Sequence, residues 1–246
     1  QAFGEIVEFA PSDPVARRRL GDLLRAHGWY VEARRQYETL QGLTPDDPTV
    51  ALLLASVAEG EGRLEEAVRW TERGRSAGAP DADQGPAATA RMFASTYLAW
   101  GRLTARQQGN QAEFDALSAR ATRVLGSAVA SGQGSPPRLR VTLTWDHPDL
   151  HPTLWTDALG APMPVFGGDM TLGIAEGLLS PTGSFEVRFD ADALRAAARL
   201  GAVAYLTIVS DELGPKETIV KKAIQASTEQ GPVLRFRFEN GEVIRG

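Results

Sequence analysis

The side chains with the clearest capacity for chemistry lie in one short stretch that carries two carboxylates and two imidazoles: Asp146, His147, Asp149 and His151. Such a set offers the nitrogen and oxygen ligands that Zn²⁺ or Ca²⁺ takes. Histidines four residues apart reach one metal ion from a helix, but Pro148 and Pro152 prevent a helix here. A calcium site needs about six oxygen ligands or more, and this stretch supplies two carboxylates. We therefore expect a solvated loop without a tight metal site, and no cofactor.

The rest of the sequence offers no convergent set of acid, base and nucleophile. The chain has no cysteine, which excludes thiol catalysis and disulfides, and it has only three histidines. His27 precedes Gly28, as at a helix end where a histidine commonly serves the helix dipole. Neither a Gly-x-Ser-x-Gly elbow nor a phosphate-binding glycine loop occurs. We expect a protein that is not an enzyme.

The dominant feature of the sequence is a repeated phrase. Residues 10–14 (Ala-Pro-Ser-Asp-Pro) and 44–48 (Thr-Pro-Asp-Asp-Pro) stand 34 residues apart. Each phrase ends in Asp-Pro, which suits a helix start, because the aspartate caps free N–H groups and proline fits the first turn. A period of this length is that of one helix–turn–helix unit in a solenoid. The sequence thus predicts stacked helical pairs, an architecture whose surface holds other molecules.

The residues between the two phrases place small, aromatic and turn-forming side chains where a helical pair needs them: Leu20, Gly21, Leu24, Gly28, Ala33, Tyr37 and Pro45. Gly21 and Ala33 are small where two antiparallel helices cross, and Gly28 suits the turn between them. On these residues the chain resembles the tetratricopeptide repeat family over residues 10–78. The resemblance implies an α-solenoid of helical hairpins that binds proteins or peptides.

Further helices are expected on both sides of this unit. A second unit follows it, with Thr71 and Gly74 departing from the family pattern. A third pair is expected at about 87–108 and 111–127, because a Gly-Asn break separates two helical stretches. Apolar residues before the first phrase predict the end of a preceding helix, so the chain is expected to begin inside a repeat of a longer protein. Helical repeats are predicted over residues 1–130.

In the tetratricopeptide family the first helix of each pair lines a concave groove. The matching positions are Val15, Arg18, Asp22 and Arg25 in the first unit and Thr49, Leu52, Ser56 and Glu59 in the second. The resemblance implies that a protein or peptide partner binds there, chiefly through Arg18, Asp22, Arg25, Leu52, Ser56 and Glu59. Charges on a helix face are also what solvation alone produces, so both interpretations stay open. A clamp for a C-terminal carboxylate is disfavoured, because Asp22 would repel it.

After residue 130 the hydrophobic period falls from that of a helix to two. A Gly/Ser/Pro-rich linker is predicted at 131–137. Apolar and polar residues then alternate, which predicts strands with one buried face, at 139–145, 185–189 and 234–238. The continuous apolar run at 202–209 predicts a strand that is buried on both faces.

Two local signals complete this picture. Residues 192–200 interrupt the alternation and predict a short helix or turn. Asn240-Gly241, between two apolar stretches, predicts a tight hairpin. The architecture that fits is an antiparallel β-sandwich over residues 138–246 with about seven strands.

The first predicted strand carries a second resemblance. Residues 139–146, which end in Leu-Thr-Trp-Asp, resemble the opening of the bacterial YfaP-type β domain. That family has no settled activity and accompanies von Willebrand A and repeat modules in envelope proteins. The resemblance implies a periplasmic or cell-envelope location. The loop that follows here is shorter and less acidic than in the family, so no ion site is carried over.

Composition narrows the range of partners. The net charge is −5, which argues against nucleic acid as a principal partner. No stretch approaches the ~18 apolar residues of a membrane span. We expect a multidomain α + β protein, an α-solenoid followed by a β-sandwich, that serves as a non-enzymatic scaffold within a larger bacterial envelope-associated protein. The alternative is a β domain for adhesion or polysaccharide binding, assisted by Ca²⁺, with the helices as a spacer.

Overall fold

The structure is a computed structural model that describes residues 12–76, 86–126, 139–145, 150, 152–156, 162–163, 173–179, 184–199, 201–227, 229, 231–239 and 242–245. The chain divides into two compact units, residues 1–97 and 98–246. Each unit is described by itself. The predicted linker at 131–137 lies outside the described residues, so the domain boundary that it marks remains a prediction.

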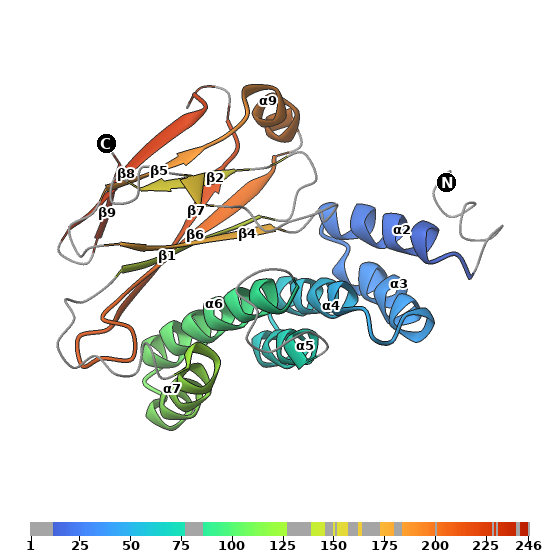
Figure 1. Ribbon diagram of the computed structural model, residues 1–246, viewed down its shortest axis with the longest axis horizontal. Helices are drawn as coiled ribbons and strands as arrows, with labels where there is room; N and C mark the ends of the chain where they lie inside the picture. The colour runs from blue at the N-terminus through green and yellow to red at the C-terminus, as the bar shows by residue number, and fades with distance from the viewer. Residues whose placement is uncertain are drawn as a thin grey trace. The chain divides into compact units, whose positions relative to one another are not determined.

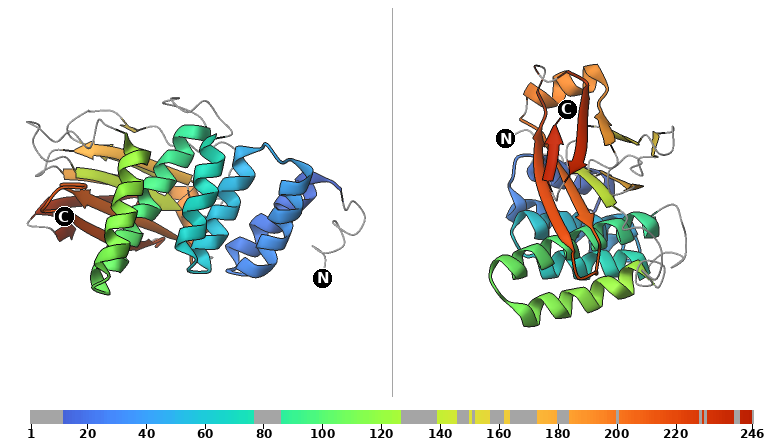
Figure 2. Two further views of the ribbon diagram at one scale, coloured as in Figure 1. Left: turned by 90° about the horizontal axis from the view of Figure 1, so that it is seen from below. Right: turned by 90° about the vertical axis from the view of Figure 1, so that its left-hand side faces the viewer.

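Residues 12–76 form two helical hairpins with short turns, α2 (Pro14–Ala26) with α3 (Tyr30–Leu43) and α4 (Pro48–Gly60) with α5 (Leu64–Ser76). The four helices lie side by side in chain order (Figures 1 and 2). Both predicted units are therefore confirmed as helical pairs. The described helices include none that is both long and apolar enough to cross a membrane.

The two hairpins begin and turn alike, as the 34-residue period predicted. The carboxylates of Asp13 and Asp47 each accept a hydrogen bond from the N–H two residues on, at 2.9 and 2.8 Å, and a proline follows each aspartate. The turns use Gly28 at φ +74° and Gly62 at φ +75°. Left-handed backbone at these two points is available to glycine without a steric cost, so the local sequence sets both ends of each first helix.

A third helical pair is present where it was expected, with α6 at Pro86–Gln107 and α7 at Gln111–Leu125. Gly109 takes a left-handed φ of +68°, and the Asn110 side chain accepts a hydrogen bond from the Glu113 N–H at 3.2 Å. The division between the two compact units falls within α6, after Tyr97. The C-terminal part of α6 and the whole of α7 thus belong to the second unit.

The β region is a sandwich of two antiparallel sheets (Figure 1). One sheet has the order β4-β1-β6-β7, formed by β4 (Gly173–Leu179), β1 (Leu139–Trp145), β6 (Val203–Ser210) and β7 (Thr218–Gln225). The other has the order β3-β2-β5-β8-β9, formed by β3 (Pro162–Met163), β2 (Thr153–Thr156), β5 (Ser184–Arg188), β8 (Val233–Glu239) and β9 (Glu242–Arg245). The predicted short helix is α9 (Ala191–Arg199).

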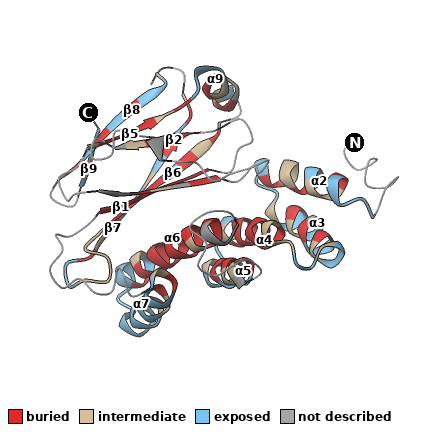
Figure 3. Cartoon of the chain, viewed as in Figure 1, coloured by how far each residue is buried: buried red, intermediate tan, exposed pale blue. Residues whose placement is uncertain are grey.

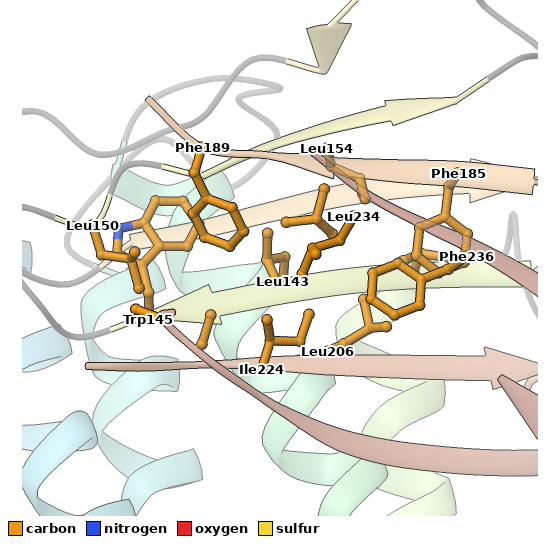
Figure 4. Close-up of a cluster of buried hydrophobic side chains, with 14 of the residues drawn as sticks. Leu143, Trp145, Leu150, Leu154, Phe185, Phe189, Leu206, Ile224, Leu234 and Phe236 are labelled. Atoms are coloured by element: carbon orange, nitrogen blue, oxygen red, sulfur yellow. The ribbon is translucent and has the colours of Figure 1, made fainter. Parts of the chain in front are cut away.

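The sandwich core lies between the inner faces of the two sheets (Figure 4). Leu143 of β1 and Leu206 of β6 face Phe185 of β5 and Phe236 of β8, and the two phenylalanine rings stack with centroids 5.4 Å apart. The alternating burial predicted for the strands at 185–189 and 234–238 is confirmed. The pairing of β8 with β9 confirms the hairpin, although its turn residues, Asn240 and Gly241, are outside the described part.

One strand departs from its prediction. All seven residues of β1 are buried, whereas alternation predicted a single buried face. The polar residues Arg140, Thr142 and Thr144 lie on the side opposite the sandwich core, and they are buried there too. Alternation of residue types marks which face is apolar, but it does not mark which face is covered. On this outer side Arg140 donates hydrogen bonds to the Glu212 carboxylate and to the Thr142 hydroxyl, so the polar face of β1 is enclosed by polar contacts.

The second strand with a notable environment is β7, which ends the four-stranded sheet. Lys221 and Lys222 stand next to each other in this strand and point to opposite faces. The Lys221 Nζ lies 3.4 Å from the Trp100 ring centroid on the outer side. The Lys222 Nζ lies 5.9 Å from the ring centroid of Phe236, a residue of the sandwich core. This end of the sandwich therefore has a charged residue on each side of the sheet.

Candidate partner-binding surface

The predicted groove positions lie on the first helix of each hairpin, α2 and α4. Because α2 and α4 begin with the same cap, Arg18 and Leu52 occupy equivalent places, as do Asp22 and Ser56. The 34-residue spacing therefore holds for the starts of both helices. The chemistry of the two sets nevertheless differs, since three of the four residues in the first set are charged, whereas the second set has one leucine, two hydroxyl residues and one glutamate.

In the first hairpin, Tyr37 links the groove positions to the packing of the helices. The Tyr37 ring lies against Gly21, where an added Cβ would stand 2.9 Å from the Tyr37 Cδ1 and closer still to Cε1. Its hydroxyl donates a hydrogen bond to the Asp22 carboxylate at 2.7 Å, and the Arg25 Nε donates one to the hydroxyl at 3.3 Å. Arg18 forms an ion pair with Asp22 at 3.6 Å. Three of the predicted groove residues are thus brought together around one tyrosine.

The electrostatics of this cluster keep the tyrosine neutral. Burial raises the pKa of the Tyr37 hydroxyl above its usual range, and the Asp22 carboxylate adds to the effect while Arg25 opposes it. A neutral hydroxyl can both donate to the aspartate and accept from the arginine. Arg25 itself is only 1% exposed. Its contribution is therefore to hold the cluster together, while Arg18, at 27% side-chain exposure, retains access to solvent.

In the second hairpin the corresponding residues are more enclosed. Leu52 and Ser56 are buried, and the Ser56 hydroxyl donates a hydrogen bond to the Leu53 carbonyl at 2.8 Å. Thr49 and Glu59 are partly exposed. Figure 3 shows buried residues along most of α4 and more exposed ones on α2. The exposed part of the predicted surface therefore lies at the start of α2, where Val15 is 59% exposed.

A second charged cluster, which the sequence did not indicate, connects the two hairpins. Arg34 of α3 forms ion pairs at 2.7 Å with Glu61, in the turn after α4, and with Glu66 of α5. Burial opposes ionisation of both glutamates, but hydrogen bonds from Arg34 outweigh it and hold the pKa of each below its ordinary value. The Tyr30 ring also lies 2.6 Å from where a Cβ on Gly60 would stand. Tyr30 of α3 and Gly60 of α4 thus form the same kind of glycine–tyrosine contact as Gly21 and Tyr37.

The sequence offered four candidate metal ligands, in a loop where we expect no tight metal site. Asp146, His147, Asp149 and His151 all lie outside the described residues. Within the described part, no group of three or more histidine, cysteine or acidic side chains is arranged to hold a metal ion. The expectation of a solvated loop at residues 146–151 therefore stays a prediction.

The outer face of the five-stranded sheet presents an aromatic residue among charged ones. Trp155 alternates with the core residue Leu154 and so points away from the sandwich core. The Arg188 guanidinium stacks 4.0 Å from the Trp155 ring centroid, and the indole Nε1 donates to the Thr153 hydroxyl at 2.9 Å. Glu186 pairs with Arg188 at 2.7 Å. This face combines a flat ring with several hydrogen-bonding groups.

Comparison with known proteins gives limited likenesses. No family model matches the chain, and no curated protein matches it. Two similar solved structures are "MamA RS-1 ArsTM double mutant", with 14% identity and a TM-score of 0.34, and "MamA 41-end from Desulfovibrio magneticus RS-1", with 16% identity and a TM-score of 0.36. In both, the match covers 54% of this chain and 65% of the other, so this chain spans less than two thirds of their length. The helical pairs described above are tetratricopeptide-like on their own period, caps and turns.

Proposed function

We propose that the protein is a non-enzymatic scaffold that binds another protein or a peptide along the first helices of its repeats. The observation that carries this proposal is the repetition of capped helical hairpins at a spacing of 34 residues. Repeats of this kind build an extended surface from equivalent positions, which suits a partner that is itself extended. The surface begins at Val15 and Arg18 on α2 and continues toward α4.

Within this surface, Arg18 supplies the charge that a partner meets. Its guanidinium is partly exposed and lies beside Asp22, whose carboxylate is also held by Tyr37. Val15, one turn earlier on the same helix, supplies exposed apolar area. We propose a partner segment that places an acidic group near Arg18 and an apolar side chain near Val15. Arg25 is buried, so it positions the Tyr37 hydroxyl and does not itself touch the partner.

The test is peptide selection with the whole chain, followed by matched charge reversals. Peptides selected from a random display library on the wild-type protein should lose at least ten-fold in affinity with Arg18→Glu. The control is Arg19→Glu, which makes the same charge change at an exposed neighbouring position on α2. Equal losses for the two variants would indicate a general charge effect and contradict a specific surface. Unchanged binding by Arg18→Glu would also contradict it.

The proposed setting is a larger protein of the bacterial envelope. Support for it comes from the resemblance of residues 139–146 to an envelope-associated β domain. The parent protein should therefore fractionate with the periplasm or the envelope when it is expressed with its complete coding sequence. Recovery in the cytoplasm alone would contradict this part of the proposal.

A second candidate function, polysaccharide binding, is favoured by the outer face around Trp155. Sugar rings stack on aromatic side chains, and their hydroxyls hydrogen-bond to arginine and carboxylate groups such as Arg188 and Glu186. Trp155→Ala should abolish retention in affinity electrophoresis through polysaccharide gels if this face binds a glycan. The same variant should leave peptide binding unchanged. Wild-type mobility that no polysaccharide alters would rule this candidate out.

A further inference from the structure

A buried arginine joins α6 to the loop between β6 and β7, all within the second unit. The Arg102 side chain has no exposed area. Its guanidinium forms ion pairs with Glu217 at 2.9 Å and with Glu212 at 3.3 Å, two residues of that loop. Among the described residues its Nη1 has no hydrogen-bond partner. A guanidinium that is buried with one nitrogen unsatisfied contributes less to stability than its ion pairs suggest.

The same loop is bound from two further directions. Arg140 of β1 donates hydrogen bonds to the Glu212 carboxylate at 2.5 and 2.6 Å. Burial opposes ionisation of Glu212, but Arg140 outweighs it and keeps the pKa of this carboxyl below its ordinary value. Arg106, one turn after Arg102 on α6, donates to the Glu217 carbonyl at 2.7 Å. Arginines therefore enclose both glutamates of the loop, and they hold Glu212 in its charged form.

The loop has an unusual backbone. Asp211 and Leu213 have φ values of +49° and +63°, in the left-handed region that favours glycine. An aspartate tolerates this conformation, but a leucine there is uncommon and strained. The Leu213 N–H donates to the Glu217 carboxylate at 3.0 Å, and the Lys216 N–H donates to the Asp211 carboxylate at 2.8 Å. Arg102 and Arg106 of α6 thus fix the position of Glu217, and the Glu217 carboxylate in turn binds the Leu213 amide.

Among the described residues, the apolar part of this contact consists of one small cluster and the Trp100 ring, which meets the Tyr205 ring edge-on with centroids 6.4 Å apart. The buried residues Ala99, Val209 and Ile219 form a cluster, with Leu103 packed against it. Beside them the Trp100 indole N–H donates to the Thr207 hydroxyl at 2.8 Å. By contrast, the sandwich core gathers many large apolar side chains from both sheets. A contact in which buried ion pairs accompany a small apolar cluster resembles the interfaces between domains, which are polar and allow relative motion, more than it resembles a core.

We propose that the β6–β7 loop, residues 211–217, is a conformational latch that fastens the C-terminal half of α6 to the sandwich and can release it while the sandwich stays folded. In the closed state, Arg102 and Arg106 hold Glu217, and Glu217 holds the strained Leu213 amide. In the open state these contacts are lost, the backbone of Leu213 relaxes, and the outer face of β6 and β7 becomes accessible. The strain and the ion pairs are therefore coupled, because neither persists without the other.

The test is amide hydrogen exchange on the whole chain with Arg102→Met, which keeps the volume of the side chain and removes its charge. The amides of Leu213 and Lys216, together with those of the last two turns of α6, should exchange at least ten-fold faster. Amides in the ladder between β5 and β8, such as those of Val187 and Leu234, should keep their wild-type rates. The control is Arg123→Met on an exposed part of α7, which should change none of these rates.

Two outcomes would overturn the latch. Unchanged exchange at Leu213 and Lys216 would mean that Arg102 does not hold the loop. Equal acceleration in the β5–β8 ladder would mean that α6 and the sandwich open as one cooperative body.

A matched pair at position 213 tests the strain without removing any charge, and it also applies if Arg102→Met does not fold. Leu213→Gly and Leu213→Ala both remove the side chain, but only glycine adopts a positive φ without strain. Exchange at Lys216 should therefore be at least three-fold slower in the glycine variant than in the alanine variant. Equal rates, or slower exchange in the alanine variant, would show that strain does not drive opening.

Discussion

Tyr37 lies across Gly21, so that one ring both fills the crossing of α2 and α3 and delivers its hydroxyl to Asp22 at 2.7 Å. The absence of a side chain at position 21 is what allows this approach. Packing and polar chemistry in the first hairpin therefore depend on the same pair of residues. A change at either residue should affect both the helix crossing and the predicted groove.

The first prediction concerns this crossing. Gly21→Leu should lower the free energy of unfolding by ~1–3 kcal/mol, because the added side chain would overpack against Tyr37. Urea denaturation followed by circular dichroism would measure the change. Gly42→Ala is the matched control, since a Cβ there would meet nothing within 4 Å. It should leave stability unchanged or raise it by a few tenths of a kcal/mol up to about 1. A neutral Gly21→Leu would contradict the crossing.

The second prediction concerns the tyrosine hydroxyl. Tyr37→Phe keeps the ring but removes the partner of Asp22 and Arg25, so it should cost ~1–3 kcal/mol. Combining it with Asp22→Asn should cost less than the sum of the two single changes, because the residues share one hydrogen bond. Thermal melts of the four proteins would complete the cycle. Strict additivity would mean that the hydroxyl and the carboxylate act independently.

The third prediction concerns pH and the cluster around Arg34. The folded-state pKa values of Glu61 and Glu66 lie below their ordinary values. Their contribution is therefore fully present above the unfolded value of about 4.3, and it is lost as the pH falls through the folded-state values. Unfolding midpoints of the wild type should fall as the pH drops from about 5 to 3.

A double variant checks the source of this pH dependence. Glu61→Gln with Glu66→Gln should be less stable at pH 7 and should show a shallower decrease in acid than the wild type. The exposed neighbour Glu65→Gln should retain the wild-type slope. If all three proteins gave the same slope, the acid sensitivity would have to come from other carboxylates.

The fourth prediction concerns the domain boundary. A nonspecific protease should cut first between Gly132 and Ser135, because a Gly/Ser/Pro segment enters a protease site without unfolding a core.

Truncated chains test whether the sandwich needs α6. A chain of residues 86–246 should be more stable than one of residues 138–246, since the shorter chain lacks Arg102 and leaves Glu217 without its ion pair. Equal melting temperatures would show that the sandwich does not need α6.

The fold was largely predictable because its signals are local. The Asp-Pro caps, the turn glycines and the 34-residue period depend on residues near one another in the chain, and all of them are present in α2 to α5. The alternating strands at 185–189 and 234–238 were predictable for the same reason. A short-range pattern reports a short-range structure well.

The charged contacts were not predictable, because their partners are far apart in sequence. Arg102 and Glu217 are separated by 115 residues, and nothing near either one marks it as half of a pair. Burial of the polar face of β1 escaped prediction in the same way, since Arg140 meets its glutamate 72 residues away. The groove residues were assigned from their positions within the repeat. Such an assignment identifies equivalent positions on a helix, but it does not show which side chains bury them.

The two lysines at the end strand of the four-stranded sheet have a consequence for how copies of this protein behave at high concentration. A strand with a free backbone edge invites another chain to pair with it and start an ordered aggregate. On β7, Lys222 points toward the sandwich core beside Phe236, while Lys221 lies over Trp100 on the other side. An incoming strand would bury both ammonium groups. Replacement of Lys222 by an apolar residue should therefore allow the edge strand β7 to pair with a strand of another copy, so that the protein polymerises.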